Sequence, residues 1–217
     1  MMSRYKEFLK NFEKAVLSAK RSIEEIEVIA VSKRKTALDI LNVLQEGHLS
    51  YGENQLQEVT KKWPELRLQY KNTKLHFIGA IQSKKIVDIV TNCDVIHALD
   101  REKLVNIISK LDKSLIAKKD FFVQINTGSE IQKSGVDLSY AEDFIQFCRQ
   151  QGIHVSGLMC LPPENEQPHK HFQILQSLAK NNHIESLSMG MTNDYDIALK
   201  YGSTHIRVGT AIFGERS

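Results

Sequence analysis

The feature that most constrains the fold of this chain is a repeated alternation between short β-rich runs and helical apolar patterns. Eight runs are rich in the β-branched, aromatic and other apolar residues that favour strands. They are Val28–Val31, Leu49–Tyr51, Leu75–Ile78, Val95–Ala98, Phe121–Ile125, His154–Leu158, Ser186–Ser188 and His205–Val208. Strands that alternate with helices are typical of βαβ units, and therefore of a parallel sheet.

Helical patterns lie between these runs, with apolar residues at the spacing of one helix face. The clearest are Ala37–Glu46, Arg101–Lys110, Ser139–Gln150, His169–Lys180 and Asp194–Tyr201. Residues 1–22 are basic and amphipathic, as a transit peptide would be, but they contain Glu7 and Glu13, and such peptides are poor in acidic residues. We therefore expect an additional N-terminal helix packed on the domain.

Eight strands that alternate with helices predict an α/β fold, a single closed (β/α)8 TIM-type barrel with an extra N-terminal helix. The length of 217 residues and the hydrophobic content of 41% are sufficient for one such domain, which we place at 1–217. A doubly wound open sheet is the alternative. Its usual nucleotide-binding signature, G-x-G-x-x-G after the first strand, is absent.

Composition excludes several classes of function. The formal net charge is only +3, and basic pairs such as Lys61-Lys62 are scattered and expected at solvated helix ends, so we expect no nucleic-acid partner. Three cysteines without close pairing form neither a disulfide framework nor a zinc site, so we expect no metal and a reducing, cytoplasmic compartment. No apolar stretch has the length of a membrane span, so we expect no membrane partner.

In a barrel enzyme, chemistry takes place at the carboxyl ends of the strands. The first run is followed by Lys33, whose amine would be a nucleophile towards carbonyl groups in a partly apolar mouth. The second run is followed by Asn54, which could contact a ligand, cap the next helix, or do both. From position alone, Lys33 is more commonly interpreted as a solvated lysine in a loop. His76 in the third run is more simply a structural histidine.

The last two strand ends carry small polar residues and glycines. Ser188 ends the seventh run and Gly190 and Thr192 follow it, and Gly209 and Thr210 follow the eighth. Barrels often bind phosphate between these two loops, where hydroxyls and backbone N–H groups gather at the start of a short helix. The alternative is that the glycines only form tight turns.

Arg207 lies two residues before Gly209, on the same face of the predicted strand. An inward arginine is costly without a partner. It either faces a ligand or forms an internal salt bridge, with Asp194 or Glu215 as candidates. A guanidinium that faces a pyridine nitrogen would keep that nitrogen unprotonated, because a second nearby positive charge is unfavourable.

Several segments, taken together, resemble the pyridoxal phosphate homeostasis protein family, also called YggS/PROSC, from about Ile26 to Gly214. They are Ala30-Val31-Ser32-Lys33, Tyr51-Gly52-Glu53-Asn54, His76-Phe77-Ile78-Gly79 with Gln82-Ser83-Lys84, Lys133-Ser134-Gly135, Gly157-Leu158-Met159, Leu187-Ser188-Met189-Gly190-Met191 and Arg207-Val208-Gly209-Thr210-Ala211-Ile212-Phe213-Gly214. The chain departs from the family at Thr192, where serine is common, at Arg34, where threonine is frequent, and at Thr36, where proline is common.

The resemblance implies a racemase-like barrel of PLP fold type III, similar to the N-terminal domain of alanine racemase. It implies pyridoxal 5′-phosphate (PLP) as the cofactor, bound covalently as a Schiff base on Lys33. Ser188, Gly209 and Thr210 match the phosphate contacts and Arg207 the arginine at the pyridine nitrogen. Asn54 and Met189 complete the expected cofactor-binding set, which contains no catalytic residue.

The resemblance also implies a role in intracellular PLP (vitamin B6) homeostasis, as a cytoplasmic and monomeric protein whose partners could include apo forms of PLP-dependent enzymes. The alternatives are a PLP-dependent amino-acid racemase and a Schiff-base aldolase without cofactor. Racemisation needs acid/base groups on both faces of the substrate. In the racemases resembled, the second base comes from a further domain, which we do not expect after Ser217.

Overall fold

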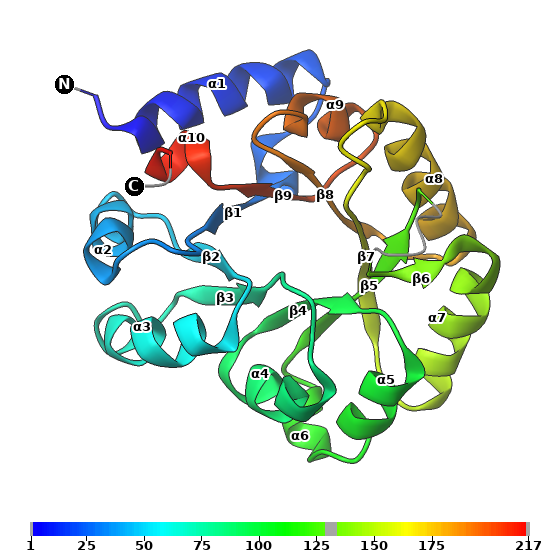
Figure 1. Ribbon diagram of the computed structural model, residues 1–217. Helices are drawn as coiled ribbons and strands as arrows, with labels where there is room; N and C mark the ends of the chain where they lie inside the picture. The colour runs from blue at the N-terminus through cyan, green and yellow to red at the C-terminus, as the bar shows by residue number, and fades with distance from the viewer. Residues whose placement is uncertain (1, 129–133, 216–217) are drawn as a thin grey trace.

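The computed structural model describes residues 2–128 and 134–215, which form a closed barrel of parallel strands surrounded by helices (Figure 1). The barrel strands are β1 (Glu27–Val31), β2 (Ser50–Glu53), β3 (Lys74–Phe77), β4 (Val95–Leu99), β5 (Asp120–Asn126), β7 (Val155–Cys160), β8 (Ser186–Met191) and β9 (His205–Val208). They follow the ring order β4-β3-β2-β1-β9-β8-β7-β5, and pairing of β4 with β5 closes the ring. The short β6 (Val136–Asp137) extends from β5. The predicted (β/α)8 barrel is confirmed.

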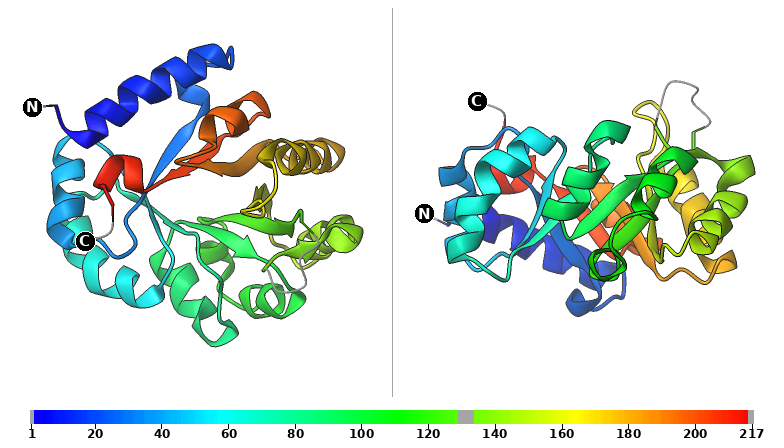
Figure 2. Two further views of the ribbon diagram at one scale, coloured as in Figure 1. Left: turned by 45° about the horizontal axis from the view of Figure 1, so that its top comes forward. Right: turned by 90° about the horizontal axis from the view of Figure 1, so that it is seen from below.

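The helices lie outside the strands, as the two further views show (Figure 2). They are α2 (Ala37–Gln45), α3 (Leu56–Gln69), α4 (Ile86–Asn92), α5 (Glu102–Ile108), α6 (Lys113–Ile116), α7 (Ala141–Gln150), α8 (Pro168–Asn181), α9 (Tyr195–Lys200) and α10 (Thr210–Phe213). Single 3₁₀ turns occupy Ile23–Glu25, Ser83–Lys85 and Leu138–Tyr140. No helix in the described part of the chain is long and apolar enough to cross a membrane.

The expected N-terminal helix is α1 (Arg4–Ser18), which starts at a Ser3 cap and packs against α9 and α10. Phe8 and Phe12 are buried on its inner face. The end of the chain is attached nearby, because Lys35 in the loop after β1 donates from Nζ to the carbonyl oxygens of Phe213, Gly214 and Glu215 at 3.3, 3.2 and 2.9 Å. The first and last segments of the chain therefore meet beside β1.

Strand positions agree with the sequence prediction best where the apolar pattern is continuous. The last strand, His205–Val208, has the predicted bounds. The second was expected at Leu49–Tyr51 but forms at Ser50–Glu53, since Ser50 and Glu53 are both buried polar residues. The helices at α6 and α10 each have four residues, too few to show a helical period in the sequence.

The barrel interior is filled by side chains rather than open. The Phe122 ring packs on His97 with ring centroids 4.4 Å apart, and a Cβ on Gly157 would lie only 2.2 Å from that phenyl ring. Outside the barrel, an apolar layer joins strands to helices, as where Tyr51 and Trp63 bring their rings within 5.0 Å. The three cysteines are buried and free, and burial raises their thiol pKa values to about 12.

Buried histidines make the fold sensitive to acid. Burial lowers the pKa of His48 to about 4, and it also lowers the pKa values of His76 and His97. His48 contacts the Tyr5 hydroxyl through Nδ1 at 3.1 Å and the Ser50 carbonyl through Nε2 at 2.8 Å. Since a carbonyl only accepts, Nε2 of His48 donates and Nδ1 accepts from Tyr5. A proton added at Nδ1 would disrupt that arrangement.

We predict that the free energy of unfolding decreases as the pH falls from about 6.5 towards 4, by up to ~1.4 kcal/mol per pH unit for each such histidine. In this window the unfolded chain binds the proton that the folded His48 excludes. Urea denaturation at pH 7.5 and 5.5 measures the change. The variant His48→Gln should reduce this pH dependence. Substitution of the exposed His154 by Gln is the matched control, and an equal effect of both variants would contradict the prediction.

Candidate functional site

The predicted site residues follow four strands that are consecutive in the ring. Lys33 follows β1, Asn54 follows β2, and Arg207 and Thr210 belong to β9 and the segment after it. The ring order β2-β1-β9-β8 also places the loop after β8 in this group. Because all these strands are parallel, their carboxyl ends meet at the same rim of the barrel. Segments from both ends of the chain are thereby brought together.

Lys33 is half-buried and sits between two anchored neighbours. Ser32 is fully buried, and its hydroxyl donates to Oε1 of Glu53 at 2.7 Å. Arg34 has the left-handed backbone conformation, with φ of 61°, and its N–H donates to Oε2 of Glu58 at 2.7 Å. The two neighbours of Lys33 are thus held by carboxylates of β2 and α3, Ser32 through its side chain and Arg34 through its backbone.

A buried ion pair lies behind this loop. Lys62 of α3 places Nζ 2.6 Å from Oε1 of Glu53 and also donates to the Ser32 carbonyl at 3.0 Å. Burial raises the pKa of Glu53, and the charge of Lys62 opposes that rise. Lys62 is an exception to the expectation that most basic pairs lie at solvated helix ends and turns, since its side chain is only 9% exposed. The polar Tyr51-Gly52-Glu53-Asn54 segment was the available signal, because a buried glutamate needs a cationic partner.

Two threonine hydroxyls face each other across the loops after β8 and β9. Oγ1 of Thr210 donates to Oγ1 of Thr192 at 3.2 Å, and Thr210 begins α10 after Gly209. Gly190 supports this arrangement: it has φ of +95°, and a Cβ there would lie 2.7 Å from Ala198. The N–H groups at the start of a helix lack intrahelical acceptors, so hydroxyls and N–H donors are combined here.

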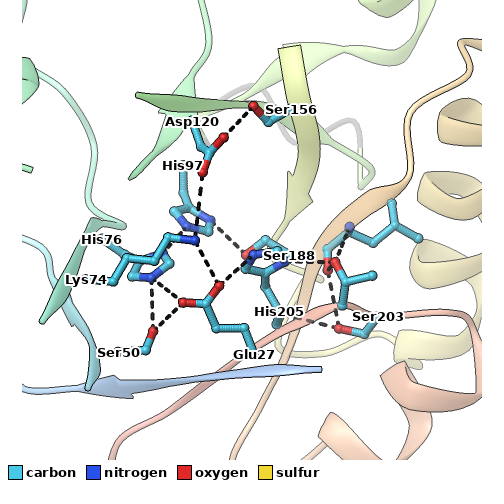
Figure 3. A network of polar contacts seen from close by, with 12 residues as sticks. Glu27, Ser50, Lys74, His76, His97, Asp120, Ser156, Ser188, Ser203 and His205 are labelled. Carbon is cyan, nitrogen blue, oxygen red and sulfur yellow. Dashed lines mark hydrogen bonds and ion pairs between the residues drawn. The ribbon is translucent and has the colours of Figure 1, made fainter. Parts of the chain in front are cut away.

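Ser188 and Met189 are placed differently from this hydroxyl pair. Ser188 is fully buried within the barrel and pairs in register with His205, the first residue of β9, so it lies deeper than Thr210. Its hydroxyl contacts Nδ1 of His97 (Figure 3) and also Nη1 of Arg207. Met189 is buried on the opposite face of β8, because side chains alternate along a strand. The cofactor contacts predicted for these two residues stay predictions.

Arg207 points into the barrel and is 4% exposed. Its Nη1 donates to the Ser188 hydroxyl at 2.6 Å and its Nη2 to the Cys160 carbonyl at 2.9 Å. The ion pairs among the described residues do not include the alternative partners Asp194 or Glu215. Burial lowers the pKa of Arg207, yet a guanidinium stays charged in proteins. A guanidinium has more N–H donors than these two bonds use.

The other predicted residues have clear positions. Among the described residues, nothing donates a hydrogen bond to the buried Oδ1 of Asn54. The helix cap expected at Asn54 is wrong, because the N-cap of α3 is Gln55. His76 has the structural place that the sequence favoured, since it contacts Glu27 and His97 in the barrel interior. Lys133 lies outside the described residues.

These residues fit PLP, the group that the family resemblance implies. A half-buried lysine at one strand end could react with an aldehyde, and the Thr192–Thr210 pair could donate to a phosphate. The buried Arg207 cation has donors to spare, and the buried Oδ1 of Asn54 is an unused acceptor. The arrangement suits a planar anionic aldehyde, and the described residues hold no group of His, Cys, Asp and Glu able to bind a metal ion.

Comparison with known proteins agrees with this fold. The family model described as alanine racemase, N-terminal domain, matches residues 8–217. A pyridoxal phosphate homeostasis protein of Vibrio alginolyticus is 34% identical, with 90% of this chain and 89% of the relative covered. The protein of the same name from Escherichia coli K12 is 31% identical, with 90% and 88% covered.

Solved structures give the same relation. PipY of Synechococcus elongatus, in a structure described as with PLP bound, has a TM-score of 0.76 and 25% identity, with 93% of this chain and 99% of PipY covered. An alanine racemase of Acinetobacter baumannii has a TM-score of 0.73 at 13% identity, with 97% and 60% covered, and shares the fold. This chain therefore belongs to the pyridoxal phosphate homeostasis protein family, whose barrel is that of the alanine racemase N-terminal domain.

Proposed function

We propose that this chain binds PLP at the carboxyl rim of its barrel, as a Schiff base on Lys33, and serves intracellular PLP homeostasis without catalytic turnover. The observation that carries the proposal is the convergence of Lys33, Arg207 and the Thr192–Thr210 pair on adjacent strands. PipY of Synechococcus elongatus, described with PLP bound, supports the same cofactor for a related barrel. The whole chain, 1–217, acts as one domain in this proposal.

When bound, PLP supplies an aldehyde that can condense with an amine, with loss of water, and a ring that can withdraw electrons. The Nζ of Lys33 is the amine, and the anchored neighbours Ser32 and Arg34 hold it at the rim. Thr192, Gly209 and Thr210 bind the phosphate through hydroxyls and N–H groups. Asn54 contacts the ring edge. Ser188 and Met189, which lie deeper in the barrel, stay members of the proposed cofactor-binding set.

Arg207 supports holding of PLP over reactions that need a strong electron sink. A cation beside the ring nitrogen keeps that nitrogen unprotonated and so weakens the ring as an electron sink. The shared family of homeostasis proteins also favours a non-catalytic role. The three buried free thiols are consistent with action in a reducing cytoplasm. We propose a monomer that passes PLP to apo forms of PLP-dependent enzymes.

The covalent link between PLP and Lys33 can be tested directly. Borohydride reduction of the PLP-loaded protein, followed by peptide mapping, should place the modification on Lys33. Lys33→Arg keeps the charge but cannot form a Schiff base, so it should lose both the modification and the visible absorbance. Lys35→Arg is the matched control and should retain both. Modification of a different lysine in the Lys33 variant would show that the assignment is wrong.

The second prediction separates the phosphate contacts. Thr192→Val or Thr210→Val should weaken PLP binding roughly tenfold and leave binding of pyridoxal, which lacks the phosphate, unchanged, because a hydrogen bond to a charged group is lost. Titration by absorbance or calorimetry gives both affinities. If Ser188→Ala instead reduces the preference for PLP over pyridoxal, the phosphate contact belongs to Ser188, as the family resemblance implied.

The third prediction concerns turnover. The PLP-loaded protein, incubated with single L-amino acids, should produce no D-enantiomer above a control with free PLP, as measured by chiral chromatography. Sustained production of D-alanine that disappears in the Lys33→Arg variant would instead establish a racemase. A purified protein that neither contains nor binds PLP would favour a cofactor-independent aldolase.

A further inference from the structure

A chain of polar side chains runs through the barrel from its amino-terminal floor to Arg207. Figure 3 shows it from Glu27 to Ser188. Glu27, the first residue of β1, lies 2.9 Å from Nε2 of His76. Nδ1 of His76 lies 2.9 Å from Nε2 of His97, and Nδ1 of His97 lies 2.9 Å from the Ser188 hydroxyl. Ser188 in turn accepts from Arg207 at 2.6 Å. We call these five residues the interior chain.

The charges at the two ends determine the direction of every hydrogen bond in the interior chain. Glu27 can only accept when ionised, and contacts with His205, His76 and Ser50 hold its pKa far below the usual range despite burial. Ser50 donates its hydroxyl proton to Glu27 at 2.7 Å, so it cannot also donate to His76. Nε2 of His76 must therefore carry a proton and donate to the carboxylate.

The same reasoning fixes the remaining links. Burial lowers the pKa values of His76 and His97, so each is neutral and carries one ring proton. Since His76 has its proton on Nε2, its Nδ1 accepts from Nε2 of His97. Nδ1 of His97 then accepts from the Ser188 hydroxyl, which accepts from Arg207. Every bond runs in one direction, from the guanidinium to the carboxylate.

This order explains how Arg207 is tolerated inside the barrel. Among the described residues its hydrogen-bond partners are a hydroxyl and a carbonyl, both neutral, although the charge of Asp194 opposes the lowering of its pKa by burial. A buried cation is costly without compensating charge. Successive polarised hydrogen bonds link it to Glu27, which also contacts Lys74 and His205 at the floor and is 24% exposed there. The interior chain thus joins a partly solvated anion to a buried cation.

We propose that Ser188, His97, His76 and Glu27 are positioning residues, which hold the Arg207 guanidinium in the orientation that presents its remaining donors to the cofactor ring. This inference rests on the proposed function for the part that concerns the cofactor. The direction of the hydrogen bonds does not depend on it. Ser188 acts through Arg207 in this arrangement, and its loss weakens binding of PLP and pyridoxal alike.

Nitrogen-15 NMR of the histidine rings in the protein without PLP tests the direction. His76 and His97 should both be neutral with the proton on Nε2. A proton on Nδ1 of either ring, or a doubly protonated ring at neutral pH, overturns the interior chain. This readout needs no cofactor, so it tests the hydrogen-bond direction alone. If the unsubstituted protein fails to bind PLP, the proposed function and the cofactor role of the interior chain are overturned, but the hydrogen-bond direction is not.

Variants test the positioning role. Ser188→Ala should weaken PLP and pyridoxal binding about tenfold each and change the Nδ1 resonance of His97, because a hydrogen bond to a charged group is lost. Ser188→Thr, which keeps the hydroxyl, should restore most of the affinity. Ser156→Ala is the control, since the half-buried Ser156 bonds Asp120 at 3.0 Å at the amino-terminal end of the barrel and is not a member of the interior chain. Equal effects of Ser188→Ala and Ser156→Ala overturn the proposal.

A second variant acts from the far end, in case Ser188→Ala does not fold. Glu27→Gln keeps an acceptor for His76 but removes the anion at the floor. It should weaken binding of both ligands several-fold, although Glu27 lies at the end of the barrel opposite the rim. Unchanged affinity in a folded Glu27→Gln protein would show that charge compensation does not pass along the chain, and would overturn the proposal.

Discussion

Closure of the strand ring is the constraint on which the rest of the structure depends. Pairing of β4 with β5 leaves no free edge among the barrel strands, and it makes all their carboxyl ends share one rim. Lys33 and Thr210 are far apart in the sequence, yet they follow the adjacent strands β1 and β9. An open sheet of the same strands would have no reason to bring the first and last strands together.

The fold was predictable because the apolar strands of a barrel are buried on both sides and interrupted by clear helical periods. Positions that depend on a partner elsewhere in the chain were less predictable. Lys62 has the sequence surroundings of a solvated lysine, and only the fold brings Glu53 against it. The depth of a side chain within the barrel could not be predicted either. Ser188 and Thr192 are four residues apart in one motif, but strand register places Ser188 in the interior and Thr192 at the rim.

The candidate site divides into parts with different physical support. The hydroxyls and glycines after β8 and β9 could be recognised from the sequence, because tight phosphate-binding turns need small residues. The ionic support behind Lys33 and the polar interior below Arg207 could not, since each joins several strands or a strand and a helix. In both places a buried charge is balanced by side chains from distant segments. The apolar pattern of one segment does not indicate which residues of another segment will contact it.

The attachment of the chain end to Lys35 has a practical consequence. Three carbonyl oxygens of residues 213–215 accept from the amine two positions beyond Lys33, so the terminus and the lysine loop form one mechanical unit. An affinity tag fused after Ser217 would pull directly on this unit. A tag before Met1 would extend from the other end of the chain, beside α1, which packs on α10. Comparison of the two fusions in cofactor-exchange kinetics would report how tightly the terminus restrains the rim.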